Sequence, residues 1–132
     1  MSAPAATSPQ QVIDALFAAL DAIDTEALEA LFSAEPQGVD ELSGGWRRGT
    51  DSIREYLDGL RESGISDVRT TRSDEHIADW GDTALATLVL EQTYTLGGEQ
   101  HRLRAPTSIV LRREDGAWRI ALVHSVPIPD SN

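Results

Sequence analysis

Residues 104–125, RAPTSIVLRREDGAWRIALVHS, decide the fold of this chain. Residues 108–112 and 118–124 are rich in β-forming side chains and short enough to be strands. The Asp115-Gly116 step between them supplies the residues of positive φ that a tight hairpin needs. These residues predict an antiparallel hairpin near the end of the chain.

Further strand patterns precede this hairpin, and helical patterns precede the strands. Strands are expected at about 66–79, 83–96, 101–113 and 117–126, separated by Gly-Asp, Gly-Gly and Asp-Gly turns. Upstream, Ser8-Pro9-Gln10-Gln11 and Asp24 predict two helix starts, and Thr50 is expected to cap a third helix. Pro36 and Gly38 are expected to end the second helical segment, and residues 39–46 to form a short strand and turn. Helices followed by an antiparallel meander indicate an α+β fold.

Length, composition and charge narrow the class of protein. We expect a loose tail over residues 1–7 and one domain over 8–128, because 132 residues suit a single core. The chain has 22 acidic residues and 11 basic ones, and all of the basic residues are Arg. The resulting net charge of −11 argues against nucleic-acid and anionic-membrane partners. The chain has no Cys, no long apolar run and no secretory leader pattern, so a cytoplasmic location is expected.

Residues 83–96 predict a second subunit. Alternate residues from Ala84 to Leu96 form one partly apolar face, and those from Thr83 to Thr95 form another. A sheet with one solvated face should alternate cleanly between apolar and polar residues. Because helices can cover only one face, we expect a homodimer that packs through the other.

Three stretches carry a resemblance to the nuclear transport factor 2-like superfamily, in particular its SnoaL-like branch. They are DAIDTEALEALF at residues 21–32, GTDSIREYL at 49–57, and the hairpin with DGAWRI and His124-Ser125. The resemblance implies a cone-shaped α+β barrel with three N-terminal helices packed on a curved, mainly antiparallel sheet. It also implies an apolar pocket and, usually, dimers. Similar proteins include isomerases, cyclases, dehydratases, epoxide hydrolases and noncatalytic binding or assembly domains.

Two residues are candidate bases. The resemblance places Asp40, nine residues before Gly49, where ketosteroid isomerases hold the Asp that moves a proton beside a carbonyl. An apolar pocket wall would raise the pKa of a carboxyl there, which suits proton abstraction near neutral pH. The Tyr that those isomerases carry on the first helix is missing here, where Leu16-Phe17 stand. His124 is the second candidate, because imidazole titrates near physiological pH. The alternatives are an exposed strand-end acid and a structural histidine.

Five residues are candidate ligand contacts. Arg104 and Ser108 share one face of their strand, and if that face is inward, Arg104 could anchor a carboxylate or an enolate. A surface charge paired with Glu91 or Asp40 is the alternative for Arg104. Trp46, Tyr56 and Trp80 are candidate pocket walls, although aromatic side chains are more often core. Trp46 lies in a polar, Gly-rich loop, which favours a pocket lid or a dimer contact.

The sequence offers no motif for a bound metal or cofactor. His76, His101 and His124 lack ligand spacing, and no phosphate loop or dinucleotide fingerprint is present. We therefore expect a small, dimeric, cofactor-free protein that binds a small apolar or carboxylate-bearing ligand, possible reactions being isomerisation or cyclisation by proton transfer. A noncatalytic ligand-binding or assembly module on the same fold is the alternative, and a partner-binding adaptor that uses Trp46 is a third hypothesis.

Overall fold

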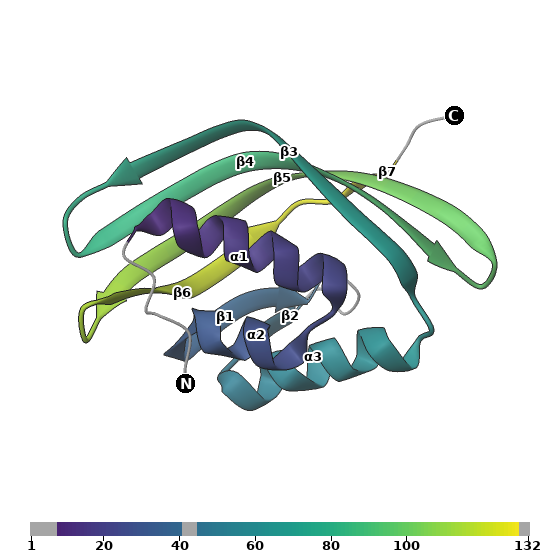
Figure 1. The fold of residues 1–132 in the computed structure, drawn as a ribbon, viewed down its shortest axis with the longest axis horizontal. Helices are drawn as coiled ribbons and strands as arrows, with labels where there is room; N and C mark the ends of the chain where they lie inside the picture. Colours follow the sequence, from purple (N-terminus) through teal and green to yellow (C-terminus); the bar gives the residue numbers. More distant parts are fainter. Residues whose placement is uncertain (1–7, 41–44, 130–132) are drawn as a thin grey trace.

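A computed structural model describes residues 8–40 and 45–129 (Figure 1). Three helices and seven strands are present in that part of the chain. The helices are α1 (Pro9–Ala22), α2 (Thr25–Leu31) and α3 (Thr50–Glu62). The strands are β1 (Phe32–Asp40), β2 (Gly45–Arg48), β3 (Ser66–Asp79), β4 (Thr83–Leu96), β5 (Glu99–Glu114), β6 (Ala117–Ser125) and β7 (Ile128–Pro129). The expected tail over residues 1–7 lies outside the described residues.

The first two helices begin where their capping residues predict. Ser8 precedes α1, with Pro9 at the first helical position, and its hydroxyl accepts a hydrogen bond from the Gln11 backbone N–H at 3.2 Å. Asp24 does the same for α2 by accepting from the Ala27 N–H at 3.1 Å. One face of α1 is fully buried because its apolar residues recur every three to four positions.

The third helix begins differently from the expectation. Gly49, with φ of 87°, occupies the N-cap position, and the cap makes no side-chain hydrogen bond. Thr50 is instead the first helical residue. The backbone N–H of Gly49 donates to the carbonyl oxygen of Pro36 at 2.9 Å, which ties the start of α3 to β1.

Pro36 and Gly38 do not end the second helical segment, as the sequence suggested. That segment, α2, ends at Leu31, and both residues lie inside β1. Proline is accepted in a strand where the hydrogen-bond ladder is irregular, because it has no N–H to donate. The pairing of β1 with β6 is irregular between Phe32 and Gln37, which brackets Pro36. The strand then pairs with β2, where Val39 lies opposite Trp46.

The sheet is open, curved and mostly antiparallel, which confirms the expected α+β class. Its strand order is β2-β1-β6-β5-β4-β3, with β7 added to β5, and only the β1–β6 pair is parallel among the described strands. Figure 1 shows the long strands arching over α1. The helices lie on one side of the sheet, and the core fills the space between them.

A β-bulge interrupts β6. Val110 pairs with Leu122, but the next residue of β5, Leu111, pairs with Ile120. Ala121 is therefore an extra residue on β6. An extra residue reverses the face on which the following side chains lie, because side chains alternate along a strand.

The bulge determines which side chains of the last strand face the helices. Strict alternation would place Trp118, Ile120, Leu122 and His124 on one face. Trp118 and Ile120 instead lie in the core on the helix side, whereas His124 is exposed on the opposite side. We call the side of the sheet that faces away from the helices the outer face.

Ion pairs connect the helices to each other and to the sheet. Arg54 of α3 makes two hydrogen bonds to the Glu29 carboxylate of α2, at 2.6 and 2.9 Å. These bonds favour the charged form and hold the pKa of Glu29 below its ordinary value of 4.5. Arg72 of β3 likewise lowers the pKa of Asp14 on α1. Both contributions to stability are complete above the ordinary carboxyl pKa and are lost as the pH falls through the lowered value.

Candidate functional site

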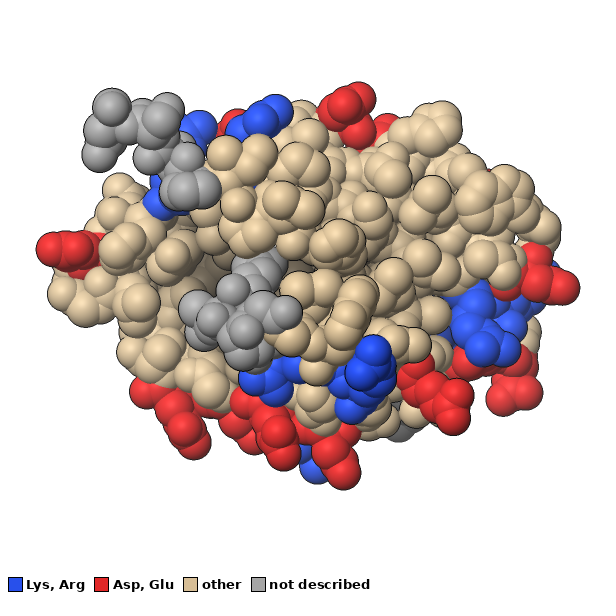
Figure 2. Space-filling view, turned by 180° about the vertical axis from the view of Figure 1, so that it is seen from behind, with Lys and Arg blue, Asp and Glu red and all other residues tan. Residues whose placement is uncertain are grey.

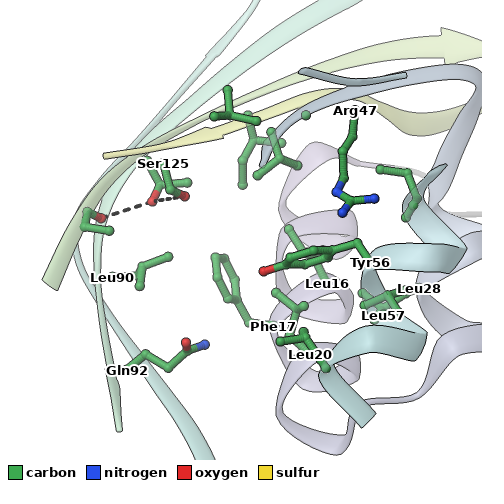
Figure 3. Close-up of a pocket in the computed structure, with 18 of the residues that line it drawn as sticks. Leu16, Phe17, Leu20, Leu28, Arg47, Tyr56, Leu57, Leu90, Gln92 and Ser125 are labelled. Atoms are coloured by element: carbon green, nitrogen blue, oxygen red, sulfur yellow. Dashed lines mark hydrogen bonds between the residues drawn. The ribbon is translucent and has the colours of Figure 1, made fainter. Parts of the chain in front are cut away.

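A mostly apolar cavity of about 200 Å³ lies between the helices and the inner face of the sheet (Figure 3). This volume is below the ~300–1,000 Å³ of pockets for drug-sized ligands, so a smaller molecule would fit. All three helices and the long strands β4 and β5 contribute to the wall. The aliphatic and aromatic lining residues include Leu16, Phe17, Leu20, Leu28, Tyr56, Leu57, Leu90, Leu103 and Ile109.

Arg47 and Tyr56 form a polar end of this cavity. The Arg47 guanidinium lies 5.5 Å from the centre of the Tyr56 ring, and its Nη1 donates to the Ser52 carbonyl oxygen at 3.2 Å. Alternation along β2 explains this placement, because Arg48 stacks over Trp46 on the opposite side of the strand. Arg47 and Tyr56 thus bring N–H and O–H groups to a mostly apolar wall.

A hydrogen-bonded chain crosses the wall from α1 to β4. The Asp21 carboxylate accepts from the hydroxyl and the backbone N–H of Thr70, at 2.7 and 3.3 Å. The amide nitrogen of Gln92 donates to the Thr70 hydroxyl oxygen at 3.2 Å. Figure 3 shows Gln92 on the strand side of the cavity, opposite the Arg47–Tyr56 end.

A hydroxyl pair supplies a further polar point on the sheet wall. The side-chain oxygens of Thr107 and Ser125 lie 3.0 Å apart, across the β5–β6 register (Figure 3). Thr107 also donates to the carbonyl oxygen of Ala105 at 3.0 Å. Because Thr107 is buried, these bonds satisfy its polar group inside the protein.

The family model for the SnoaL-like domain matches residues 10–129. The chain belongs to the SnoaL-like family. A search of the curated proteins finds no match.

Solved structures of low sequence identity share the fold of this SnoaL-like domain. A ketosteroid isomerase-like protein from Erwinia carotovora is 17% identical with a TM-score of 0.80, over 92% of this chain and 94% of that one. A candidate dehydratase of the nuclear transport factor 2-like family from Streptomyces avermitilis is 17% identical with a TM-score of 0.81, over the same shares. A kinase hub domain from S. rosetta is 17% identical with a TM-score of 0.79, over 97% and 100%.

Tyr56 is the one expected ligand contact that lines the cavity of this SnoaL-like domain. Arg104 and Ser108 do not line it, because the inward residues of β5 are Leu103, Ala105, Thr107 and Ile109. The structure therefore places Arg104 and Ser108 outside this cavity, and a ligand-anchoring role for either stays a prediction. Arg104 is exposed on the outer face, opposite Glu91 in the register of β4 and β5.

Trp46, His124 and Trp80 also lie away from the cavity. The rings of Trp46 and His124 approach to 6.5 Å on the outer face, and Trp46 is 54% exposed. The bulge at Ala121 turns His124 away from the cavity, and its role as a base stays a prediction. Trp80 lies in the turn between β3 and β4, is 65% exposed, and does not line this cavity.

Asp40 ends β1 next to the cavity wall. Its neighbour Val39 lines the cavity, and its backbone pairs with Gly45 of β2. The side chain of Asp40 lies outside the described part of the structure, so its role as a base stays a prediction. Within the described residues, no group of three or more His, Cys, Asp or Glu side chains is arranged to hold a metal ion. In the same residues, no helix has both the length and the apolar character to cross a membrane.

Sequence reasoning missed Arg47 and Gln92. A signal existed for Gln92, since it is a lone amide on the strand face that carries Ala84, Ala86, Leu88 and Leu90. For Arg47 the signal was weaker. Its inward facing follows from alternation with Trp46 only once β2 is known to be a strand.

Proposed function

We propose that this SnoaL-like chain binds a small organic ligand in the cavity between its helices and sheet. The apolar cavity with its polar groups at separate points carries the proposal. Such an arrangement buries the apolar body of a ligand and fixes its orientation with a few hydrogen bonds. A thermal-shift screen with small aromatic ketones, lactones and carboxylates tests it, because a ligand that binds only the folded state raises its stability.

Arg47 is the proposed anchor if the ligand carries a carboxylate, in place of Arg104. A guanidinium forms charge-assisted hydrogen bonds to carboxylates, which are about twice as strong as neutral ones. We expect Arg47→Gln to weaken binding of 2-naphthoate about tenfold or more and that of neutral 2-naphthamide much less. Isothermal titration calorimetry measures both affinities.

Arg48→Gln is the matched control for this prediction, because Arg48 lies beside Trp46 on the other side of β2. It removes the same charge from a side chain that does not itself line the cavity. Equal losses in both variants would mean that net charge, and not the position of Arg47, governs binding.

Proton-transfer catalysis, as isomerisation or cyclisation, is a second candidate function. It is supported by the place of Asp40 beside cavity-lining Val39 and by the fold shared with a ketosteroid isomerase-like protein.

With Asp40 as base, Asp40→Asn should retain ligand binding while slowing turnover of a bound ketone by more than about a hundredfold. Deuterium exchange beside the carbonyl, followed by NMR, measures this rate. Exchange at the wild-type rate in the variant would remove Asp40 from the mechanism, and absence of exchange in the wild type would favour the noncatalytic ligand-binding alternative.

A homodimer through the outer face completes the proposal. Aliphatic side chains of three central strands lie there, namely Leu85, Val89, Val110 and Leu122, and all are only half-buried in the single chain. Seen from behind, the molecule presents a broad surface with few charges at its middle (Figure 2). Exposed Trp46 borders this face through its contact with His124. Apolar patches of this kind mark protein contacts.

Val110→Glu is expected to convert the proposed dimer into a monomer, because it buries a charge at the middle of the interface. Light scattering after size exclusion should then give 14.3 kDa instead of twice that mass. Thr83→Glu, at the exposed end of β4, is the control and should stay dimeric. A wild-type mass of 14.3 kDa at micromolar concentration would refute the dimer.

A further inference from the structure

We infer that Gln92 determines specificity by accepting a hydrogen bond from a donor group of the ligand, an inference that rests on the proposed ligand-binding function. The ligand class is thereby narrowed to small apolar molecules with a hydroxyl or N–H group directed at the sheet wall. The positions of the protons in two hydrogen-bonded groups of that wall determine whether it offers the ligand donors or acceptors.

The Asp21–Thr70 pair determines which way the Gln92 amide points. An ionised carboxylate can only accept hydrogen bonds, so the single hydroxyl proton of Thr70 goes to Asp21, 2.7 Å away. The Thr70 oxygen is then left as an acceptor, and the group of Gln92 that meets it must be the NH₂. The amide oxygen of Gln92 is consequently the atom left for the cavity.

The Thr107–Ser125 pair also presents a hydrogen-bond acceptor to the cavity. Thr107 has one hydroxyl proton and donates it to the Ala105 carbonyl oxygen. The contact of 3.0 Å with Ser125 therefore requires Ser125 to be the donor. The Ser125 oxygen retains its lone pairs but has no further proton, so it too can offer the cavity only an acceptor.

Two acceptors on one apolar wall favour ligands that bring donors. A ligand without a donor would leave the Gln92 oxygen buried and unpaired, which costs more than the bond itself contributes. Sites built to bond a hydroxyl discriminate strongly against analogues that lack it for this reason. Gln92 is therefore expected to distinguish a hydroxyl from an isosteric fluorine.

The test compares 2-naphthol with 2-fluoronaphthalene by calorimetry on the wild-type chain, on Gln92→Leu and on Thr70→Val. The ratio of the two dissociation constants removes effects that both probes share. We expect the preference for 2-naphthol to fall about tenfold in Gln92→Leu, with binding of 2-fluoronaphthalene retained or improved. Thr70→Val should reduce the preference in part, because it releases the amide to rotate while leaving Gln92 in place.

The outcomes separate the role of Gln92 from ligand binding itself. A ratio that stays at the wild-type value in both variants overturns the role of Gln92 while leaving ligand binding intact. Failure of the wild type to bind either probe contradicts the proposed function itself. If Gln92→Leu does not fold, Thr70→Val alone serves as the test. Valine is nearly isosteric with threonine, and Thr70 is not one of the residues that line the cavity.

Discussion

Replacing Ile120 by alanine should lower the free energy of unfolding by about 2–5 kcal/mol. Ile120 is fully buried, pairs with Leu111 and packs in the core without lining the cavity. Removing its side chain forfeits apolar burial and leaves a void that the strands can only partly close. Urea denaturation followed by circular dichroism measures the loss.

Leu122→Ala is the matched control, two residues along the same strand. Because the bulge at Ala121 places Leu122 on the outer face, its truncation should cost much less than that of Ile120 when both are measured on dilute protein. Equal losses would contradict the bulge, since uninterrupted alternation would put Ile120 and Leu122 on one face. The comparison therefore tests the register of β6 as well as the core.

Leu90→Trp should abolish ligand binding. Leu90 lines the cavity from β4, and an indole there would occupy most of the space that a small ligand needs (Figure 3). At a ligand concentration about 100 times Kd, the wild type gains about 2.7 kcal/mol from binding, and the variant should lose this gain. Differential scanning fluorimetry with and without ligand measures it.

Thr93→Trp controls for the added bulk. It introduces the same side chain three positions further along, on the other face of β4 and outside the aliphatic patch of the proposed dimer, and should retain the thermal shift. Overpacking at Leu90 is expected to cost about 1–3 kcal/mol, so the unliganded melting temperature of each variant is its own reference. A full thermal shift in Leu90→Trp would place the ligand outside this cavity.

Helix starts and turns could be predicted because each depends on a few neighbouring residues. Ser8 and Asp24 cap their helices through backbone N–H groups three positions ahead. Asp115 and Gly116 both take positive φ in the predicted hairpin turn. The first turn of α3 shows the limit of such local reasoning, because Gly49 is positioned by its bond to Pro36 and not by a capping side chain.

Site residues were predicted less well because facing is a property of strand pairs. Tyr56 was predicted as a pocket wall and lines the cavity, whereas Arg104 and His124 lie on the outer face. The side of the sheet on which Arg104 lies could not be settled from the alternation of residues in the sequence alone. The facing of His124 was reversed by one extra residue in its strand.

The α+β class, the three helices, the four long strands and most of the signals at their ends could be predicted from the sequence. The folded structure was needed to show that Arg47 and Gln92 meet the same cavity and that the bulge at Ala121 separates Ile120 from His124. The difference comes from how far along the chain each kind of interaction acts. Propensities and caps act within one turn of chain, while the register that orients a strand is set by a partner strand and by packing against helices far away in sequence.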